Sequence, residues 1–252
     1  MTPLNNRDVL ILGALIIIGA VVVELYSNYS NPFIDYTPTG YSNLLTGAPQ
    51  RFNYYKDGAL IGTYTYTLSG QTAAGGTTLY TLDTAVDIKY QFNHFTVNST
   101  YRFLSEVSHV GYSLDYGQNG TKTNLQCIFT SNKVGIVSYS TGKNQTTSID
   151  LPANTILVDN NNPVHWELLA KSFTATAGNR YRINAFVPQG GVVQQFEYGV
   201  DTAHQFINIG SKSYECVVAR EPNFEITLYY YNGDLIQYKN DVDNILIVKQ
   251  IP

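Results

Sequence analysis

The chain has 252 residues, 15 Lys and Arg against 19 Asp and Glu, a formal net charge of −4 and only 13% charged residues. This balance excludes a basic nucleic-acid-binding protein, so we expect no nucleic acid partner, and a hydrophobic content of 44% excludes a disordered acidic chain. Tyr is the outlier with 21 residues, and a polar, uncharged, Tyr-rich chain is typical of an extracellular all-β protein.

An uninterrupted apolar run from Val9 to Val23 follows a short polar N-terminus. As a helix it would span about 22 Å, and Leu25 and Tyr26 extend it toward the roughly 30 Å hydrocarbon core of a bilayer. A cleaved signal peptide is the alternative, but no pair of small residues precedes a plausible cleavage site. We therefore predict that residues 9–26 form a transmembrane anchor, or an uncleaved signal, in the lipid bilayer.

The orientation of this anchor follows from one charge. Arg7 is the only basic residue before the apolar run, so residues 1–8 are expected in the cytoplasm and the C-terminal domain outside the cell. Residues 27–50 mix Pro, Gly, Ser and Asn without a sustained period, which predicts a linker or stalk. Residues 51–252 then form the extracellular β domain of a single-pass protein of the cell membrane.

Alternation of apolar and polar residues recurs from Arg51 onward, with turn residues between the segments. In residues 63–68, for example, Tyr64, Tyr66 and Leu68 share one face. About a dozen such segments predict half-buried antiparallel strands. The predicted fold is all-β, a large curved antiparallel sheet that forms an open barrel or a β-sandwich, together with the N-terminal transmembrane helix and one short helix.

Two hairpin turns are predicted at Asp57-Gly58 and Asn232-Gly233, because a type I′ turn requires positive φ at both central residues. In the second hairpin, a two-residue loop pairs Tyr230 with Leu235 and Leu228 with Gln237, and it places Ile236 and Tyr238 on the other face. Both faces of that hairpin should therefore be partly covered, or the loop should be wider.

One short helix is predicted after Asn162, which is expected to cap it, with Pro163 at the first helical position. Good helix formers follow in residues 164–173 (VHWELLAKSF), which include Trp166, the only tryptophan. We expect this helix to plug the open end of a barrel or to cover a sheet.

The two cysteines, Cys127 and Cys216, lie in alternating β segments. A pair in an exported domain predicts a disulfide, and two buried reduced thiols are the alternative. Four Asn-X-Ser/Thr triplets mark candidate glycosylation sites at Asn28, Asn98, Asn119 and Asn144. The abundance of Asn, Ser and Thr accounts for their number, so they indicate only where glycans could attach.

Catalytic and metal-binding motifs are missing from the sequence. The four histidines have no metal-ligand spacing, and neither a nucleophile elbow nor a phosphate-binding loop is present. The turn Asp241-Val242-Asp243-Asn244 could offer oxygen ligands to Ca²⁺, but it lacks the Gly and the distal Glu of an EF-hand, which favours a solvated turn. We therefore expect no metal, no cofactor and no enzymatic activity.

Tyrosine on strands has two interpretations. It can fill a core while its hydroxyl reaches water, or it can line a cavity that holds an apolar or glycan ligand. The candidate ligand-facing aromatic residues are Tyr64, Tyr66, Trp166 and Tyr230.

Several segments are similar to uncharacterised exported β proteins: residues 54–70 (YYKDGALIGTYTYTLSG), 165–173, 180–187, 213–220 and 225–239. Such proteins resemble lipoprotein-carrier (LolA/LppX-like) open barrels, in which a curved sheet wraps around a helix. The resemblance covers roughly residues 51–240 and implies an apolar-ligand or carrier role, although this chain has no lipobox Cys near its N-terminus. The composition also resembles that of archaeal surface proteins.

The sequence therefore predicts a membrane-anchored, non-enzymatic extracellular β domain that binds an apolar or glycan ligand or a surface partner. The alternative is a structural or accessory subunit of a membrane or cell-surface assembly, such as a filament, an envelope or a membrane complex. An open, aromatic cavity would favour the first role, and a filled core with an exposed apolar patch would favour the second.

Overall fold

The computed structural model describes residues 31–41, 44, 46–140, 143–159 and 162–251. It divides the chain into two compact units, Met1–Ile34 and Asp35–Pro252. The predicted anchor at residues 9–26 and its orientation lie outside the described residues and remain predictions. Across the ranges that are described, no helix is both long enough and apolar enough to traverse a bilayer.

Strands make up most of the second unit, and the short β1 (Phe33–Asp35) spans its boundary with the first. The strands before the helix are β2 (Gln50–Lys56), β3 (Ala59–Thr72), β4 (Thr78–Tyr90), β5 (Asn93–Leu104), β6 (His109–Gln118), β7 (Thr121–Thr130), β8 (Lys133–Ser140), β9 (Lys143–Asp150) and β10 (Ile156–Leu157). Those after it are β11 (Arg180–Val187), β12 (Val192–Val200), β13 (Gln205–Ile209), β14 (Lys212–Glu221), β15 (Ile226–Tyr231), β16 (Asp234–Asn240) and β17 (Ile245–Lys249).

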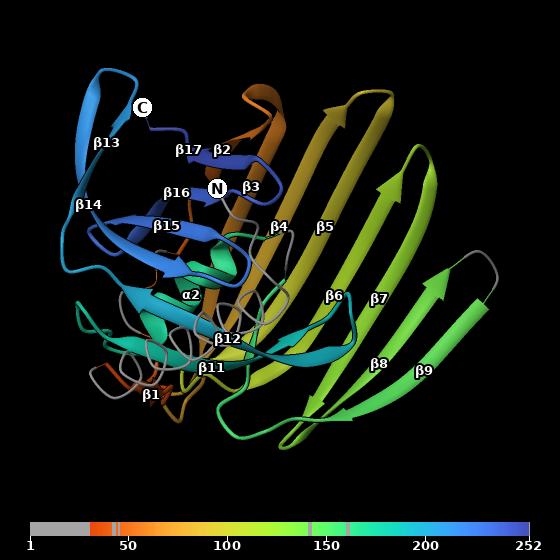
Figure 1. Cartoon of the computed structure of the whole chain (residues 1–252). Helices are drawn as coiled ribbons and strands as arrows, with labels where there is room; N and C mark the ends of the chain where they lie inside the picture. The colour runs from red at the N-terminus through yellow and green to blue at the C-terminus, as the bar shows by residue number, and fades with distance from the viewer. Residues whose placement is uncertain (1–30, 42–43, 45, 141–142, 160–161, 252) are drawn as a thin grey trace, which may run out of the picture. The chain divides into compact units, whose positions relative to one another are not determined.

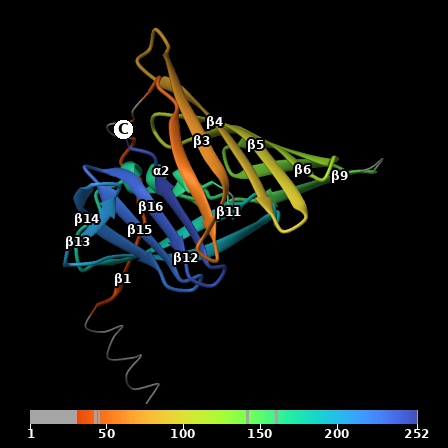
Figure 2. The ribbon, with the colours of Figure 1, turned by 90° about the horizontal axis from the view of Figure 1, so that it is seen from above.

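These strands form one sheet, in the order β10-β11-β12-β13-β14-β15-β16-β17-β2 and then sequentially to β9. β10 is parallel to β11, and the pairs from β11 to β9 are antiparallel. Within the described ranges β9 pairs only with β8, so the sheet stays open. It curves around the helix α2 (Figures 1 and 2). The prediction of an all-β fold with a large curved sheet and one short helix is confirmed.

The helix α2 (Val164–Ser172) lies inside the curved sheet, and nearly all of its side chains are buried. The predicted capping role of Asn162 is wrong. Pro163 is the N-cap residue and makes no side-chain cap, because proline has no polar side chain. The buried Asn162 Nδ2 donates to Ser99 Oγ (3.1 Å) and to the Asp159 carboxylate, and Asn162 Oδ1, the atom that would cap, accepts from no described residue. The bonds of its amide nitrogen therefore fix the Asn162 side chain in the core, in an orientation in which its oxygen does not cap the helix.

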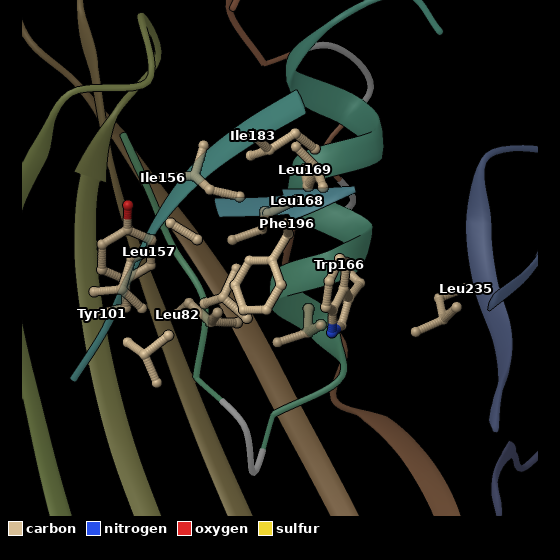
Figure 3. Close-up of a cluster of buried hydrophobic side chains, with 14 of the residues drawn as sticks. Leu82, Tyr101, Ile156, Leu157, Trp166, Leu168, Leu169, Ile183, Phe196 and Leu235 are labelled. Carbon is tan, nitrogen blue, oxygen red and sulfur yellow. The ribbon is translucent and has the colours of Figure 1, made fainter. Parts of the chain in front are cut away.

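The main core fills the space between the helix and the concave face of the sheet. Figure 3 shows Leu82 and Tyr101 from β4 and β5 on one side, Leu168 and Leu169 from α2 on the other, and Ile183 of β11 beside Leu169. All five are buried. Alternating apolar residues on each strand and an apolar helix produce this single packed layer.

Both predicted hairpin turns are present. Asp57-Gly58 has φ values of 50° and 78°, and Asn232-Gly233 has φ values of 52° and 83°. Tyr230 pairs with Leu235 as predicted, but Leu228 pairs with Tyr238 rather than Gln237, because a bulge between Tyr229 and Tyr230 shifts the register. Tyr238 therefore faces the main core, and its predicted place beside Ile236 is wrong. Leu235 packs in the main core and Ile236 in a second cluster, so both faces of the hairpin are covered. That second cluster consists of Tyr214, Cys216, Val218, Tyr229 and Ile236.

The predicted disulfide is absent. Cys127 and Cys216 are both free and buried. Cys127 packs in the main core and Cys216 in the second cluster, which lies on the opposite face of the sheet because Ala219 of the same strand points into the main core. The sheet therefore separates the two thiols, and the alternative of buried reduced cysteines describes this structure.

Part of the predicted linker, from Asp35 onward, belongs to the second unit and packs within it. Tyr36 is buried, its hydroxyl hydrogen-bonds to Ser172 Oγ at 2.7 Å, and its amide donates to the Arg182 carbonyl at 3.0 Å. From Tyr36 onward this segment is therefore tied to the end of α2.

Candidate functional site

A cavity of about 270 Å³ lies beside the first turn of α2, and we call it the aromatic cavity. Its walls come from segments that are distant in sequence. It is lined by Tyr54, Pro163, Trp166, Phe196, Phe224, Ile226, Tyr238, Asn240, Asp243, Ile245 and Ile247.

Strand pairing places one wall of the aromatic cavity. Tyr54 of β2 pairs with Ile247 of β17, which pairs in turn with Tyr238 of β16. Cross-strand partners share a face, so these three side chains form one row. Two residues further along, Ile245 pairs with Asn240 in a second row on the same face.

Aromatic rings form the opposite wall. The rings of Trp166 and Phe196 meet edge to face at 5.7 Å, and those of Phe196 and Phe224 at 5.5 Å. Trp166 is 3% exposed, whereas Phe224 is 44% exposed and marks the mouth of the cavity. The buried Glu221 fixes the Phe224 turn, because its carboxylate accepts the Phe224 amide at 2.7 Å.

The polar groups of the aromatic cavity are incompletely used. No described residue accepts the indole N–H of Trp166, although this side chain is almost fully buried. At the exposed end, the Asp243 amide donates to Asn240 Oδ1 (2.8 Å), Asn240 Nδ2 donates to Asp243 Oδ2 (3.4 Å), and Lys56 Nζ donates to the backbone carbonyl of Asp243 (2.7 Å). Within the described ranges no lysine or arginine forms an ion pair with the Asp243 carboxylate.

Two tyrosine hydroxyls of the cavity remain protonated at neutral pH. Burial raises the pKa of Tyr238 to about 12; the Asn240 hydrogen bond opposes this shift and the Asp243 charge adds to it. Burial also raises the pKa of Tyr54, with further contributions from Tyr238 and Asp243. Both hydroxyls can therefore donate and accept hydrogen bonds.

Among the aromatic residues singled out from the sequence, only Trp166 lines this cavity. Tyr64, Tyr66 and Tyr230 are buried in the main core. The Tyr66 hydroxyl donates to Glu167 Oε2 (3.2 Å) and the Tyr230 hydroxyl to the Trp166 carbonyl (3.0 Å). Those tyrosines fill the interior of the curved sheet, and they do not line the aromatic cavity.

A second cavity, of about 350 Å³, lies near the β5–β6 turn. Here His109 Nε2–H donates to the Thr155 carbonyl (2.7 Å) and Nδ1 accepts the Tyr101 hydroxyl (2.5 Å). Val107, with φ 68°, is strained in its wall. Because both nitrogens of His109 are engaged within the protein, this cavity offers less to a ligand than the aromatic cavity does.

Other predicted sites are compatible with the structure but untested by it. Asn98, Asn119 and Asn144 are exposed, and Asn28 lies outside the described residues. Asn119 also occupies a tight turn, where its Oδ1 accepts the His94 amide at 2.8 Å. In the portion of the chain that the structure covers, no group of three or more His, Cys, Asp or Glu side chains could hold a metal ion.

Comparison with known proteins places the fold in a β-barrel-like class. The structure is similar to the crystal structure of a β-barrel-like protein of domain of unknown function DUF1849 from Brucella abortus, with a TM-score of 0.51 and 15% identity over 82% of this chain and 97% of that chain. A DUF1089 family protein from Pseudomonas aeruginosa gives a TM-score of 0.42 and 10% identity over 81% and 95% of the two chains. No family model and no curated protein matches the sequence. At this identity the first likeness supports the fold alone.

Proposed function

We propose that the chain is a non-enzymatic ligand-binding protein and that the aromatic cavity holds an apolar or glycan ligand. One observation carries this proposal: in a domain whose curved interior is packed, a cavity lined by aromatic side chains remains, and the Trp166 N–H has no acceptor among the described residues. Concave sites with aromatic walls and a few convergent polar groups are the usual form of small-ligand sites.

The proposal includes a location. Residues 9–26 anchor the chain in the cell membrane, and the β domain lies outside the cell, as the apolar run and the single preceding charge indicate. A helix inside a curved open sheet is also the arrangement of the lipoprotein-carrier barrels that the sequence resembles. That likeness supports a carrier role in which the ligand is passed on unchanged.

Binding is testable through Trp166, because it is the only tryptophan and lines the aromatic cavity. We expect its emission to change saturably when the full chain is titrated with simple methyl glycosides or with a brominated fatty acid that quenches indole on contact. Phe224→Ala removes an apolar wall at the mouth and should weaken binding about tenfold, which corresponds to about 1.4 kcal/mol.

The matched control is Phe206→Ala, since Phe206 is an exposed phenylalanine of β13 that does not line the cavity. It should bind as the wild type does. The proposal fails if no probe alters Trp166 emission, or if both variants bind equally well.

Topology is tested with Ser211→Cys, in the exposed turn after β13. The two native thiols are buried and should not react. A membrane-impermeant maleimide should label this variant on intact cells. Labelling that requires cell lysis would place the domain on the cytoplasmic side.

A structural or accessory role is the second candidate, favoured by a row of turns that expose apolar side chains. The β2–β3, β4–β5 and β16–β17 turns adjoin, because the Asp57 amide donates to the Asn244 carbonyl (3.0 Å) and Tyr90 Oη donates to Asp57 Oδ2 (2.8 Å). On them Leu60, Phe92 and Val242 are more than half exposed.

Such a row suits contact with another subunit. If this role is correct, the full chain should sediment as an assembly that Phe92→Ser dissociates while Trp166 titrations stay unchanged. A monomer for both chains would refute it.

A further inference from the structure

We infer that the ligand of the aromatic cavity is a glycan, held through one terminal pyranose residue. This inference rests on the proposed function and concerns the chemistry of the same cavity. It follows from three properties of the cavity: the aromatic wall, the polar groups that line it, and the volume.

The aromatic wall fits the C–H face of a sugar ring. A pyranose presents several C–H groups on one face and hydroxyls around its edge. Aromatic faces carry partial negative charge and attract such C–H groups, and they also exclude water from them. Trp166, Phe196 and Phe224 form a continuous set of rings from the buried end of the cavity to its mouth.

The polar groups distinguish a sugar from a wholly apolar ligand. An alkyl chain would cover the Trp166 N–H without accepting its hydrogen bond, and an unsatisfied buried donor is costly. Sugar hydroxyls both accept and donate. They can accept from Trp166 Nε1, donate to the Asp243 carboxylate and exchange hydrogen bonds with the Tyr54 hydroxyl, and these three residues line the cavity. The Asn240 amide is already bonded to Asp243 at both ends.

The same groups argue against an alkylammonium ligand. Aromatic rings and a carboxylate can attract a cation, but a cation offers no acceptor for the indole N–H of Trp166. Asp243 is also at the exposed end, where water screens its charge.

The volume limits the ligand to one residue. At roughly 30 Å³ for each water molecule, the cavity holds about nine waters, which suits a single sugar of about a dozen non-hydrogen atoms. Further residues of an oligosaccharide would pass out between Phe224 and Asp243, the exposed residues of the mouth.

The experiment titrates the full chain, in a sugar-free detergent or in lipid nanodiscs, and follows Trp166 emission. The probes are the methyl glycosides of glucose, galactose, mannose and N-acetylglucosamine, a brominated dodecanoic acid, and tetramethylammonium chloride. We expect at least one glycoside to bind saturably and the other two probes to leave Trp166 emission unchanged.

Two matched variants locate the site. Asp243→Asn keeps the shape of the side chain but weakens its acceptor, so glycoside affinity should fall about tenfold. Asp241→Asn is the control, because Asp241 lies in the same turn, pairs with Lys239 Nζ at 2.7 Å and does not line the cavity. It should bind like the wild type, and equal thermal unfolding of the two variants excludes a folding defect.

The outcomes separate the two proposals. If only the brominated acid or only tetramethylammonium changes Trp166 emission, the glycan inference is overturned and the ligand-binding function stands. If glycosides bind equally to both variants, Asp243 has no part in binding and the inference is overturned as well. If no probe acts, both proposals fall.

Discussion

Three charged side chains, those of Glu167, Lys171 and Asp234, are linked by ion pairs at the edge of the packed core. Lys171 Nζ lies 3.0 Å from Glu167 Oε1 and 2.7 Å from Asp234 Oδ1, and the Leu235 amide donates to Glu167 Oε2 at 3.2 Å. Burial is the largest influence on Glu167 and raises its pKa, while the Lys171 charge opposes that shift. Each of these charges therefore lowers the stability of the fold if its partners are removed.

Lys171→Met tests this dependence. The substitution removes the cation that Glu167 and Asp234 share. Losing one partner of a buried pair costs about 3–5 kcal/mol of unfolding free energy, to be measured by urea denaturation. The double variant Glu167→Gln, Lys171→Met should regain part of that loss. A loss below about 1 kcal/mol in the single variant would show that the group contributes little to stability.

His109 should make stability depend on pH. Burial lowers its pKa to about 4, against about 6.5 in an unfolded chain. Between these values the unfolded state binds more protons, so the free energy of unfolding is complete above about pH 6.5 and falls as the pH drops toward 4. The full effect is on the order of 3 kcal/mol, at about 1.4 kcal/mol per pKa unit.

His109→Gln keeps an acceptor for the Tyr101 hydroxyl and a donor for the Thr155 carbonyl. Urea unfolding at several pH values should give a shallower dependence for this variant. Some slope should remain, because burial also lowers the pKa of His165. Identical profiles for wild type and variant would show that His109 does not titrate on unfolding.

The residues of the aromatic cavity were only partly predictable. Trp166 drew attention as the single tryptophan on an expected helix. Phe196, Phe224 and Tyr238 carry no local signal, because β12, the β14–β15 turn and β16 meet only after the sheet has curved. The sequence shows Asp243 only as part of a turn that could offer oxygen ligands to Ca²⁺. It does not show that Asp243 lines a cavity together with aromatic residues from other strands.

At the scale of elements, local sequence patterns predicted the strands and turns. They did not predict which strands distant in sequence pair with one another. The Asn232-Gly233 dipeptide specified its turn because few other residues tolerate two successive positive φ values. The pairing of β17 with β2 joins segments nearly 200 residues apart, and no periodicity reports such a contact. A bulge between Tyr229 and Tyr230 likewise depends on the packing of both faces.

The β3–β4 pairing contains a close approach that can be tested. A Cβ atom at Gly62 would lie 2.0 Å from the Asp87 carbonyl oxygen and 2.7 Å from the Ile88 Cα. Gly62→Ala must therefore push two backbones apart, at a cost of about 1–3 kcal/mol. Gly199→Ala is the control, since a Cβ there meets nothing within 4 Å. Equal midpoints in thermal unfolding for the two variants would contradict the close approach.

At the scale of the whole second unit, the curved sheet has two separately covered faces. The main core lies on the concave face with α2, and the second cluster is formed by side chains of β14, β15 and β16 on the other face, with Ile207 and Ile209 of β13 packed against it. Figures 1 and 2 show the curvature of the sheet around α2. The pattern of the β15–β16 hairpin predicts that both faces carry apolar residues. It could not show that each cysteine faces a different side, which is why a disulfide was expected.

Thiol counting tests this two-sided arrangement. Two free thiols per chain should react with a chromogenic disulfide in denaturant without reductant, and neither should react in the folded protein, because both are buried. Burial also raises the pKa of Cys127 to about 12, which keeps it as the unreactive thiol. Free thiols that appear only after reduction would mean that the chain carries the disulfide after all.

The proposed function depends on ligand binding in the aromatic cavity, and the Trp166 indole N–H is a direct probe of that binding. A ¹⁵N-labelled chain should give a single indole cross-peak, because it has one tryptophan. We predict that a bound methyl glycoside moves this peak saturably downfield and that Phe224→Ala weakens the effect about tenfold. An indole peak that stays in place with every glycoside and with the brominated acid would contradict the account.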